Sequence, residues 1–201
     1  MGLFSGLRHG LDRTVRSGWQ ASTKAAGLQP GRLLGWELTA DGGYCIASVG
    51  LLSVTGSGPT SDQPDWSHIG WHRIERGGYD KDSATLRWEL YATDPDTEPQ
   101  SGEAQSGAVR LKDPGQLPAI FRDRVAASIA VEHFIALEGA PKVQKVEPGV
   151  IVSGRRDLSR PQSSIEWRAS VPRGLDWDIP GLRELAATSI IRLRSEYDPD
   201  H

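Results

Sequence analysis

Short apolar runs separated by turn residues occupy positions 32–92 of the chain. The runs are rich in β-branched and aromatic residues, and turn-forming residues interrupt them at 40–43, 56–59 and 77–78. This pattern is typical of antiparallel strands joined by tight turns. We therefore expect strands throughout this stretch, with a further turn at 80–83. A last strand is expected at 108–112, after a loop or linker at 94–107.

Apolar residues recur at helical spacing in three other stretches. The first covers residues 1–28, and its apolar stripe includes Leu3, Phe4, Leu7, Leu11, Val15 and Trp19. The second follows the helix start signal Asp113-Pro114 and extends to about Leu137. The third begins at 178–180 and continues to Leu193. Because a spacing of three or four residues places side chains on one helix face, the pattern predicts three helices. Two strands are expected before the last helix, at 143–152 and 165–171.

A family resemblance rests on the first hairpin and on the second helical stripe. The hairpin reads W-x-x-x-A-D-G-G-Y-x-x-A-S from Trp36, and I-x-W-x-x-I-E-R follows at Ile69. The stretch from Asp113 to Ser128 reads D-P-G-x-L-x-x-x-F-R-x-R-V-A-A-S. These motifs resemble those of bacterial pleckstrin-homology-like domains, and especially those of an uncharacterised actinobacterial family. The resemblance implies a binding or scaffolding module with no assigned function.

The expected fold class is α+β. The resemblance implies a pleckstrin-homology-like antiparallel β-barrel or sandwich that is capped by a helix. We expect this part at 31–138, preceded by an N-terminal amphipathic helix at 1–30. A β-β-α extension is expected at 139–201.

The charge distribution limits the classes of partner. The net charge of the 201 residues is −3, but residues 1–30 carry +3, residues 31–106 carry −7 and residues 107–201 carry +1. Phosphate groups and nucleic acids are bound through clustered Lys and Arg, so the acidic β unit disfavours both. No apolar run reaches the length of a membrane span and no secretory signal is evident. We therefore expect a cytoplasmic location, with peripheral contact at a membrane as the alternative.

Reactive side chains form no recognisable catalytic or metal-binding motif. Cys45, the only cysteine, is expected in the core of a strand. His68 and His72 are interpreted as surface histidines, because on a strand they would lie about 13 Å apart. His133 is expected to make a partly buried contact on the second helix. The sequence thus predicts no catalytic residue, no cofactor and no metal ion.

The first functional hypothesis is a non-enzymatic adaptor or accessory subunit. Its N-terminal helix would dock on a larger protein assembly, which could be membrane-associated. The expected contact residues are Phe4, Leu7, Leu11, Val15 and Trp19, with Arg13 and Arg16 beside them. A helix of this kind can also lie weakly on a membrane surface. The structural alternative is that the helix packs on its own domain.

Two other hypotheses remain open from the sequence. One is a small-molecule-binding protein or enzyme with a pocket between the barrel and the C-terminal unit. The other is an RNA- or ribosome-associated factor that would use the basic cluster Arg155, Arg156 and Arg160. We interpret this cluster first as a solvated hairpin loop, and second as a docking site for an acidic partner.

Overall fold

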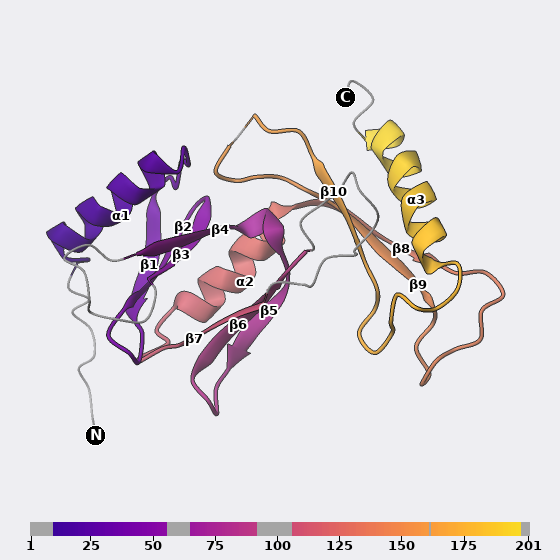
Figure 1. The fold of residues 1–201 in the computed structure, drawn as a ribbon, viewed down its shortest axis with the longest axis horizontal. Coiled ribbons are helices and arrows are strands. Elements are labelled where there is room, and N and C mark those ends of the chain that lie inside the picture. The colour runs from indigo at the N-terminus through magenta and orange to yellow at the C-terminus, as the bar shows by residue number, and fades with distance from the viewer. Residues whose placement is uncertain (1–9, 56–64, 92–105, 161, 198–201) are drawn as a thin grey trace.

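The computed structural model describes residues 10–55, 65–91, 106–160 and 162–197. Within these residues the chain is an α+β protein with three α-helices and three antiparallel sheets, none of which closes into a barrel. The sheets follow one another along the chain, as the colour ramp in Figure 1 shows. The expected α+β class is therefore confirmed, and the closed-barrel form of the expectation is wrong.

The first sheet contains the hairpin that the sequence predicts. Its strands are β1 (Leu33–Leu38), β2 (Tyr44–Ser48), β3 (Leu51–Thr55) and β4 (Trp66–Gly70), in the order β1-β2-β3-β4. Gly42 in the first turn has a φ of +87°, a backbone conformation that favours glycine. The predicted turn at 40–43 is therefore confirmed.

A short 3₁₀ helix, η1 (Trp71–Arg73), leads from the first sheet into the second. The second sheet contains β5 (Ile74–Asp80), β6 (Thr85–Leu90) and β7 (Ser106–Arg110), in the order β5-β6-β7. Its hairpin turns after Asp80, whose carboxylate accepts hydrogen bonds from the backbone N–H groups of Asp82 and Ser83. The turn expected at 77–78 is wrong, because both glycines lie inside β5.

The two sheets and the helix α2 (Leu117–Ser128) enclose the first core. The sheets meet at one corner, where Thr39 and Leu111 form an isolated β-bridge. The ring of Phe121 on α2 meets Trp71 edge-on, with ring centroids 5.9 Å apart. The buried members of this core are Cys45, Ala47, Leu52, Ile69, Trp71, Ile74, Leu86, Trp88, Leu90, Val109, Leu111, Leu117 and Phe121.

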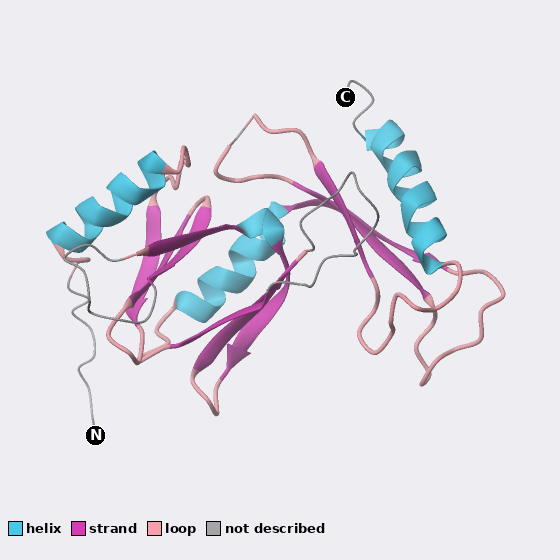
Figure 2. Ribbon diagram, in the orientation of Figure 1, coloured by secondary structure: helices cyan, strands magenta, loops and turns pink. Residues whose placement is uncertain are grey.

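The helix α1 (Arg13–Ala25) packs on the outer face of the first sheet (Figure 2). Asp12 caps it, since its carboxylate accepts a hydrogen bond from the N–H of Thr14 at 2.8 Å. The helix therefore begins later than the predicted start at residue 1. Residues 1–9 and the predicted loop at 56–59 lie outside the described residues, as does most of the predicted loop at 94–107.

The third sheet contains β8 (Ile129–Ala136), β9 (Gly149–Arg155) and β10 (Glu166–Ser170), in the order β10-β9-β8. The helix α3 (Leu182–Tyr197) covers one face of it and completes a second core, with Leu182 and Val152 fully buried. The predicted helix to Leu137 is wrong beyond Ser128, because β8 follows at once. The last helix is confirmed. None of the described helices is long and apolar enough to cross a membrane.

Candidate functional site

The described apolar residues that were expected to dock the N-terminal helix on a partner pack against the chain's own first sheet. Leu11 is 5% exposed and Trp19 is 2% exposed, and Val15 packs beside them in the same cluster. The indole N–H of Trp19 donates a hydrogen bond to the Ser53 hydroxyl at 3.0 Å. Arg13 and Arg16 are exposed on the opposite face, and Phe4 and Leu7 lie outside the described residues. The apolar face of α1 is thus already covered.

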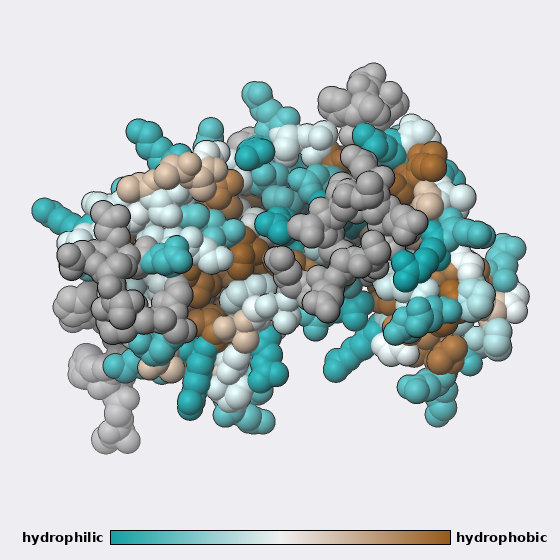
Figure 3. Space-filling view, in the orientation of Figure 1, coloured by the Kyte–Doolittle hydropathy of each residue, from teal (hydrophilic) through white to brown (hydrophobic). Residues whose placement is uncertain are grey.

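A groove of about 730 Å³ runs between β5 and α2. Strand β5 is an edge strand, and no strand pairs with its outer side among the described residues. Polar side chains surround hydrophobic atoms at the surface in the region of α2 (Figure 3). The groove is lined by Glu75, Gly77, Gly78, Tyr79, Lys81, Pro114, Gly115, Pro118, Ala119, Phe121, Arg122, Val125, Ala126, Ile129, Glu132 and Arg155.

Small residues keep this groove open. A Cβ on Gly77 would lie 2.6 Å from the Phe121 ring, so glycine lets α2 approach the strand closely. A Cβ on Gly78 would meet nothing within 4 Å. On the helix side, Ala119 and Ala126 are exposed and present only methyl groups. The two glycines were the sequence signal for this site, but as adjacent turn-forming residues they were interpreted as a turn.

Several of the side chains that line the groove are charged. Lys81 and Arg122 are exposed, whereas Arg155 is only 3% exposed. The carboxylate of Glu75 is mostly buried and pairs with Arg76 at 2.9 Å. Burial raises the pKa of Glu75, and the nearby Arg76 and Arg155 act against that rise. The groove therefore combines an apolar lining with a few charged groups, as specific ligand sites commonly do.

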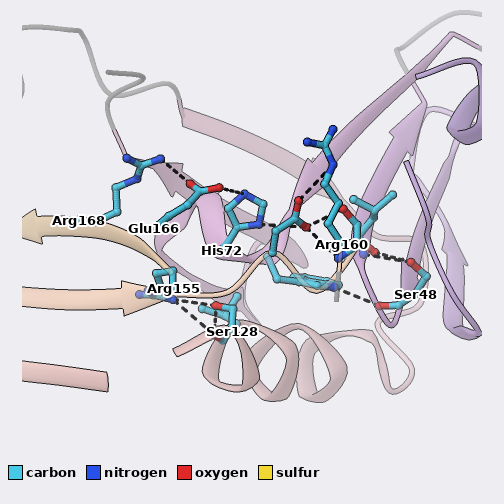
Figure 4. Close-up of polar contacts among 12 residues, drawn as sticks. Ser48, His72, Ser128, Arg155, Arg160, Glu166 and Arg168 are labelled. Carbon is cyan, nitrogen blue, oxygen red and sulfur yellow. Dashed lines mark hydrogen bonds and ion pairs between the residues drawn. The ribbon is translucent and has the colours of Figure 1, made fainter. Parts of the chain in front are cut away.

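The interpretation of the basic cluster as a solvated loop is wrong for Arg155, whereas Arg156 and Arg160 are exposed. Arg155 ends β9, and its guanidinium points toward Ser128 at the end of α2 (Figure 4). Nη1 donates to the Ser128 hydroxyl at 3.1 Å and Nη2 donates to the Tyr91 hydroxyl at 3.0 Å. Arg155 thus joins the third sheet to the rest of the molecule at one end of the groove.

A second polar cluster forms around His72, which is 7% exposed and therefore not a surface residue as expected. Its Nδ1 lies 3.5 Å from the Asp157 carboxylate and its Nε2 lies 3.5 Å from the Glu166 carboxylate. Glu166 in turn pairs with Arg168 at 2.7 Å (Figure 4). Burial lowers the pKa of His72, while Glu166 and Asp157 act to raise it. The cluster holds η1 against the third sheet.

The other candidate side chains belong neither to the groove lining nor to the cluster around His72. Cys45 is fully buried as expected, and burial, reinforced by Glu37, raises the pKa of its thiol to about 12. His68 accepts or donates hydrogen bonds with Ser22 and Ser53 beneath α1. His133 lies on β8, not on a helix, and its Nε2 contacts the Tyr197 hydroxyl at 3.2 Å. In the part of the chain that the structure describes, no group of three or more His, Cys, Asp or Glu side chains could hold a metal ion.

Comparison of the chain with protein-family models, curated proteins and solved structures found no match. The function is therefore inferred from the geometry of the site.

Proposed function

We propose that this protein is a non-enzymatic binding module that takes up an extended peptide segment of a partner protein. The segment would add as a strand to the outer edge of β5, and its side chains would enter the groove between β5 and α2. The observation that carries this proposal is an apolar groove beside a strand edge with which no described strand pairs. Main-chain hydrogen bonds to the edge would supply affinity, and the groove would select side chains.

A pleckstrin-homology-like sandwich formed by residues 33–128 is part of this proposal. A four-stranded sheet is followed by a corner, a three-stranded sheet and a helix, and this order supports a pleckstrin-homology-like sandwich. Such a unit would serve as an adaptor that docks on a larger protein assembly. We assign the docking to the groove instead of to the N-terminal helix, because Leu11 and Trp19 are buried on the chain's own first sheet.

The test begins with a selection from a library of random linear peptides on the full chain. An enriched peptide should protect from hydrogen exchange the backbone amides of β5 that point away from β6, which are alternate residues along the stretch Gly77 to Tyr79. Failure to enrich any peptide would count against the proposal, and so would protection confined to another surface.

A matched pair of variants locates the binding. Ala126 and Ala127 are neighbours on α2 and both are exposed, but only Ala126 lines the groove. The variant Ala126→Arg should weaken the enriched peptide by about tenfold or more, because a long side chain occupies the groove. Ala127→Arg adds the same charge to the same helix and should bind like the unmodified chain. Equal binding by both variants would place the peptide elsewhere.

A further inference from the structure

Arg155 is a buried cation whose hydrogen-bond partners in the described part of the chain are all uncharged. Besides the hydroxyls of Ser128 and Tyr91, its guanidinium contacts the Ser153 hydroxyl at 3.4 Å and the Val125 carbonyl at 3.5 Å. The guanidinium also lies over the Tyr91 ring, 5.4 Å from its centroid. Four of the five N–H groups of an arginine are thereby used, which leaves one on Nη2.

Glu75 is close enough to Arg155 for an electrostatic interaction, but it forms no ion pair with it. No carboxylate oxygen among the described residues lies within 4.0 Å of the nitrogens of Arg155. Glu166 stands opposite it on β10 but pairs with Arg168, and Glu75 pairs with Arg76. A buried charge without an ion-pair partner is costly, because water no longer solvates it. An anion that reaches Arg155 from the groove would remove that cost.

We propose that Arg155 binds a carboxylate of the peptide in the β5–α2 groove, and this inference rests on the function proposed above. The carboxylate is either the C-terminus of the peptide or an acidic side chain, since both offer the same two oxygens. Glu75 and Glu132 line the groove with Arg155. Lys81 and Arg122 line it as well, so the lining carries three cationic and two acidic side chains, a net charge of +1 that a single carboxylate neutralises.

The test compares three synthetic forms of a peptide enriched in the library selection. One has a free C-terminus, one has a C-terminal amide, and one has its Asp and Glu residues replaced by Asn and Gln. Removal of the carboxylate that reaches Arg155 should weaken binding by about 10- to 100-fold, in line with a lost charge-assisted hydrogen bond. The form that loses affinity identifies the source of the carboxylate.

Arg122 supplies a matched control, because it also lines the groove but its side chain is 78% exposed. In Arg155→Lys and Arg155→Met the difference in affinity between the peptide forms should shrink or vanish. In Arg122→Met this difference in affinity should persist. Because Arg155 also holds the third sheet, a spectroscopic readout on the unmodified chain accompanies the variants. The side-chain NMR signals of Arg155 should shift with the carboxylate form and not with the form that lacks it.

The possible outcomes distinguish a failure of the carboxylate proposal from a failure of the proposed groove function. If all peptide forms bind equally and remain sensitive to Ala126→Arg, the carboxylate proposal is overturned while the groove function stands. A shift of the Arg155 signals with every form would likewise overturn it. If no peptide is enriched at all, both proposals fall together.

Discussion

Trp19 provides the most direct test of what α1 does. Its indole is buried in the cluster with Leu11, Ile46 and Trp66, and its N–H is paired with Ser53. Trp19→Ala should lower the free energy of unfolding by about 3–5 kcal/mol, as for other buried aromatic residues. Gln20→Ala, which changes an exposed neighbour on the same helix, should stay within about 0.5 kcal/mol. Urea unfolding of both variants measures the two values. Equal stabilities would mean that the helix contributes little to the core.

The adjacent glycines of β5 should respond differently to the same substitution. In Gly77→Ala the new methyl group would lie 2.6 Å from the Phe121 ring and 2.7 Å from the Arg87 carbonyl oxygen. Relief of this contact requires α2 or the strand to move, so we expect a loss of about 1–3 kcal/mol. Gly78→Ala has open space and should change stability by less than about 0.5 kcal/mol. Thermal or urea unfolding of both variants measures the two changes in stability. If Gly78→Ala were the less stable variant, the result would contradict this packing.

Arg155 and His72 show why sequence patterns did not find the polar side chains of the site. Each was interpreted as solvent-exposed, because Arg and His in a polar context are usually exposed. Their burial depends on partners far along the chain: Tyr91 for Arg155, and Asp157 and Glu166 for His72. No local spacing records such pairs. The core residue Cys45 was predictable, because its apolar neighbours on the strand are themselves core positions.

The boundary between α2 and β8 shows where periodicity fails for whole elements. Leu117, Phe121 and Val125 follow helical spacing, and Ile129 continues it. From Ile129 onward, however, alternate residues also share one face, and their side chains are half-buried while the intervening ones up to Phe134 are exposed. Both periods fit the same short stretch. Pairing with β9 over the length of β8 selects the strand, and this long-range partner is invisible in a local pattern.

The cap of α1 should make the helix sensitive to acid. Hydrogen bonds from the backbone N–H groups of Thr14 and Val15 lower the pKa of Asp12 below 3.8 in the folded state. The charged cap thus stabilises the fold above this pH, and the contribution is lost as the pH falls through the lowered pKa. Asp12→Ala should therefore be less stable than the unmodified chain at neutral pH, with a smaller difference at acid pH. Asp12→Ser keeps an uncharged acceptor and should show less of this pH dependence. The measurement is the free energy of unfolding in urea, from neutral to acid pH. If the difference between Asp12→Ala and the unmodified chain does not change with pH, the role of the charge is contradicted.

Several polar contacts join the third sheet to the first two sheets, in addition to the apolar contact that Leu158, after β9, makes with the first core. Arg76 donates to the Val171 carbonyl at 2.6 Å, Tyr91 contacts Ser153 at 3.1 Å, and His72 lies between Asp157 and Glu166. The two large apolar cores lie on either side of this boundary and share no residue. The relative placement of the two parts therefore depends in part on polar contacts, and among these the charge of His72 changes with protonation.

His72 should make the stability of the whole molecule fall on acidification. Burial lowers its pKa below 6.5; Arg168 and Arg73 act in the same direction, and Glu166 and Asp157 act against it. The unfolded chain then takes up a proton near pH 6.5, whereas the folded chain does so only at lower pH. The unfolded state is thereby favoured as the pH falls through this interval.

The measurement is the free energy of unfolding in urea at several pH values between about 7.5 and 5, an interval that brackets the ordinary histidine pKa. The unmodified chain should lose stability more steeply than His72→Gln, whose side chain does not titrate. His68, whose pKa burial also lowers, is present in both and contributes equally to both slopes. If the unmodified chain instead gains stability relative to His72→Gln on acidification, the two carboxylates outweigh burial. The charged histidine would then be the form that holds the third sheet in place.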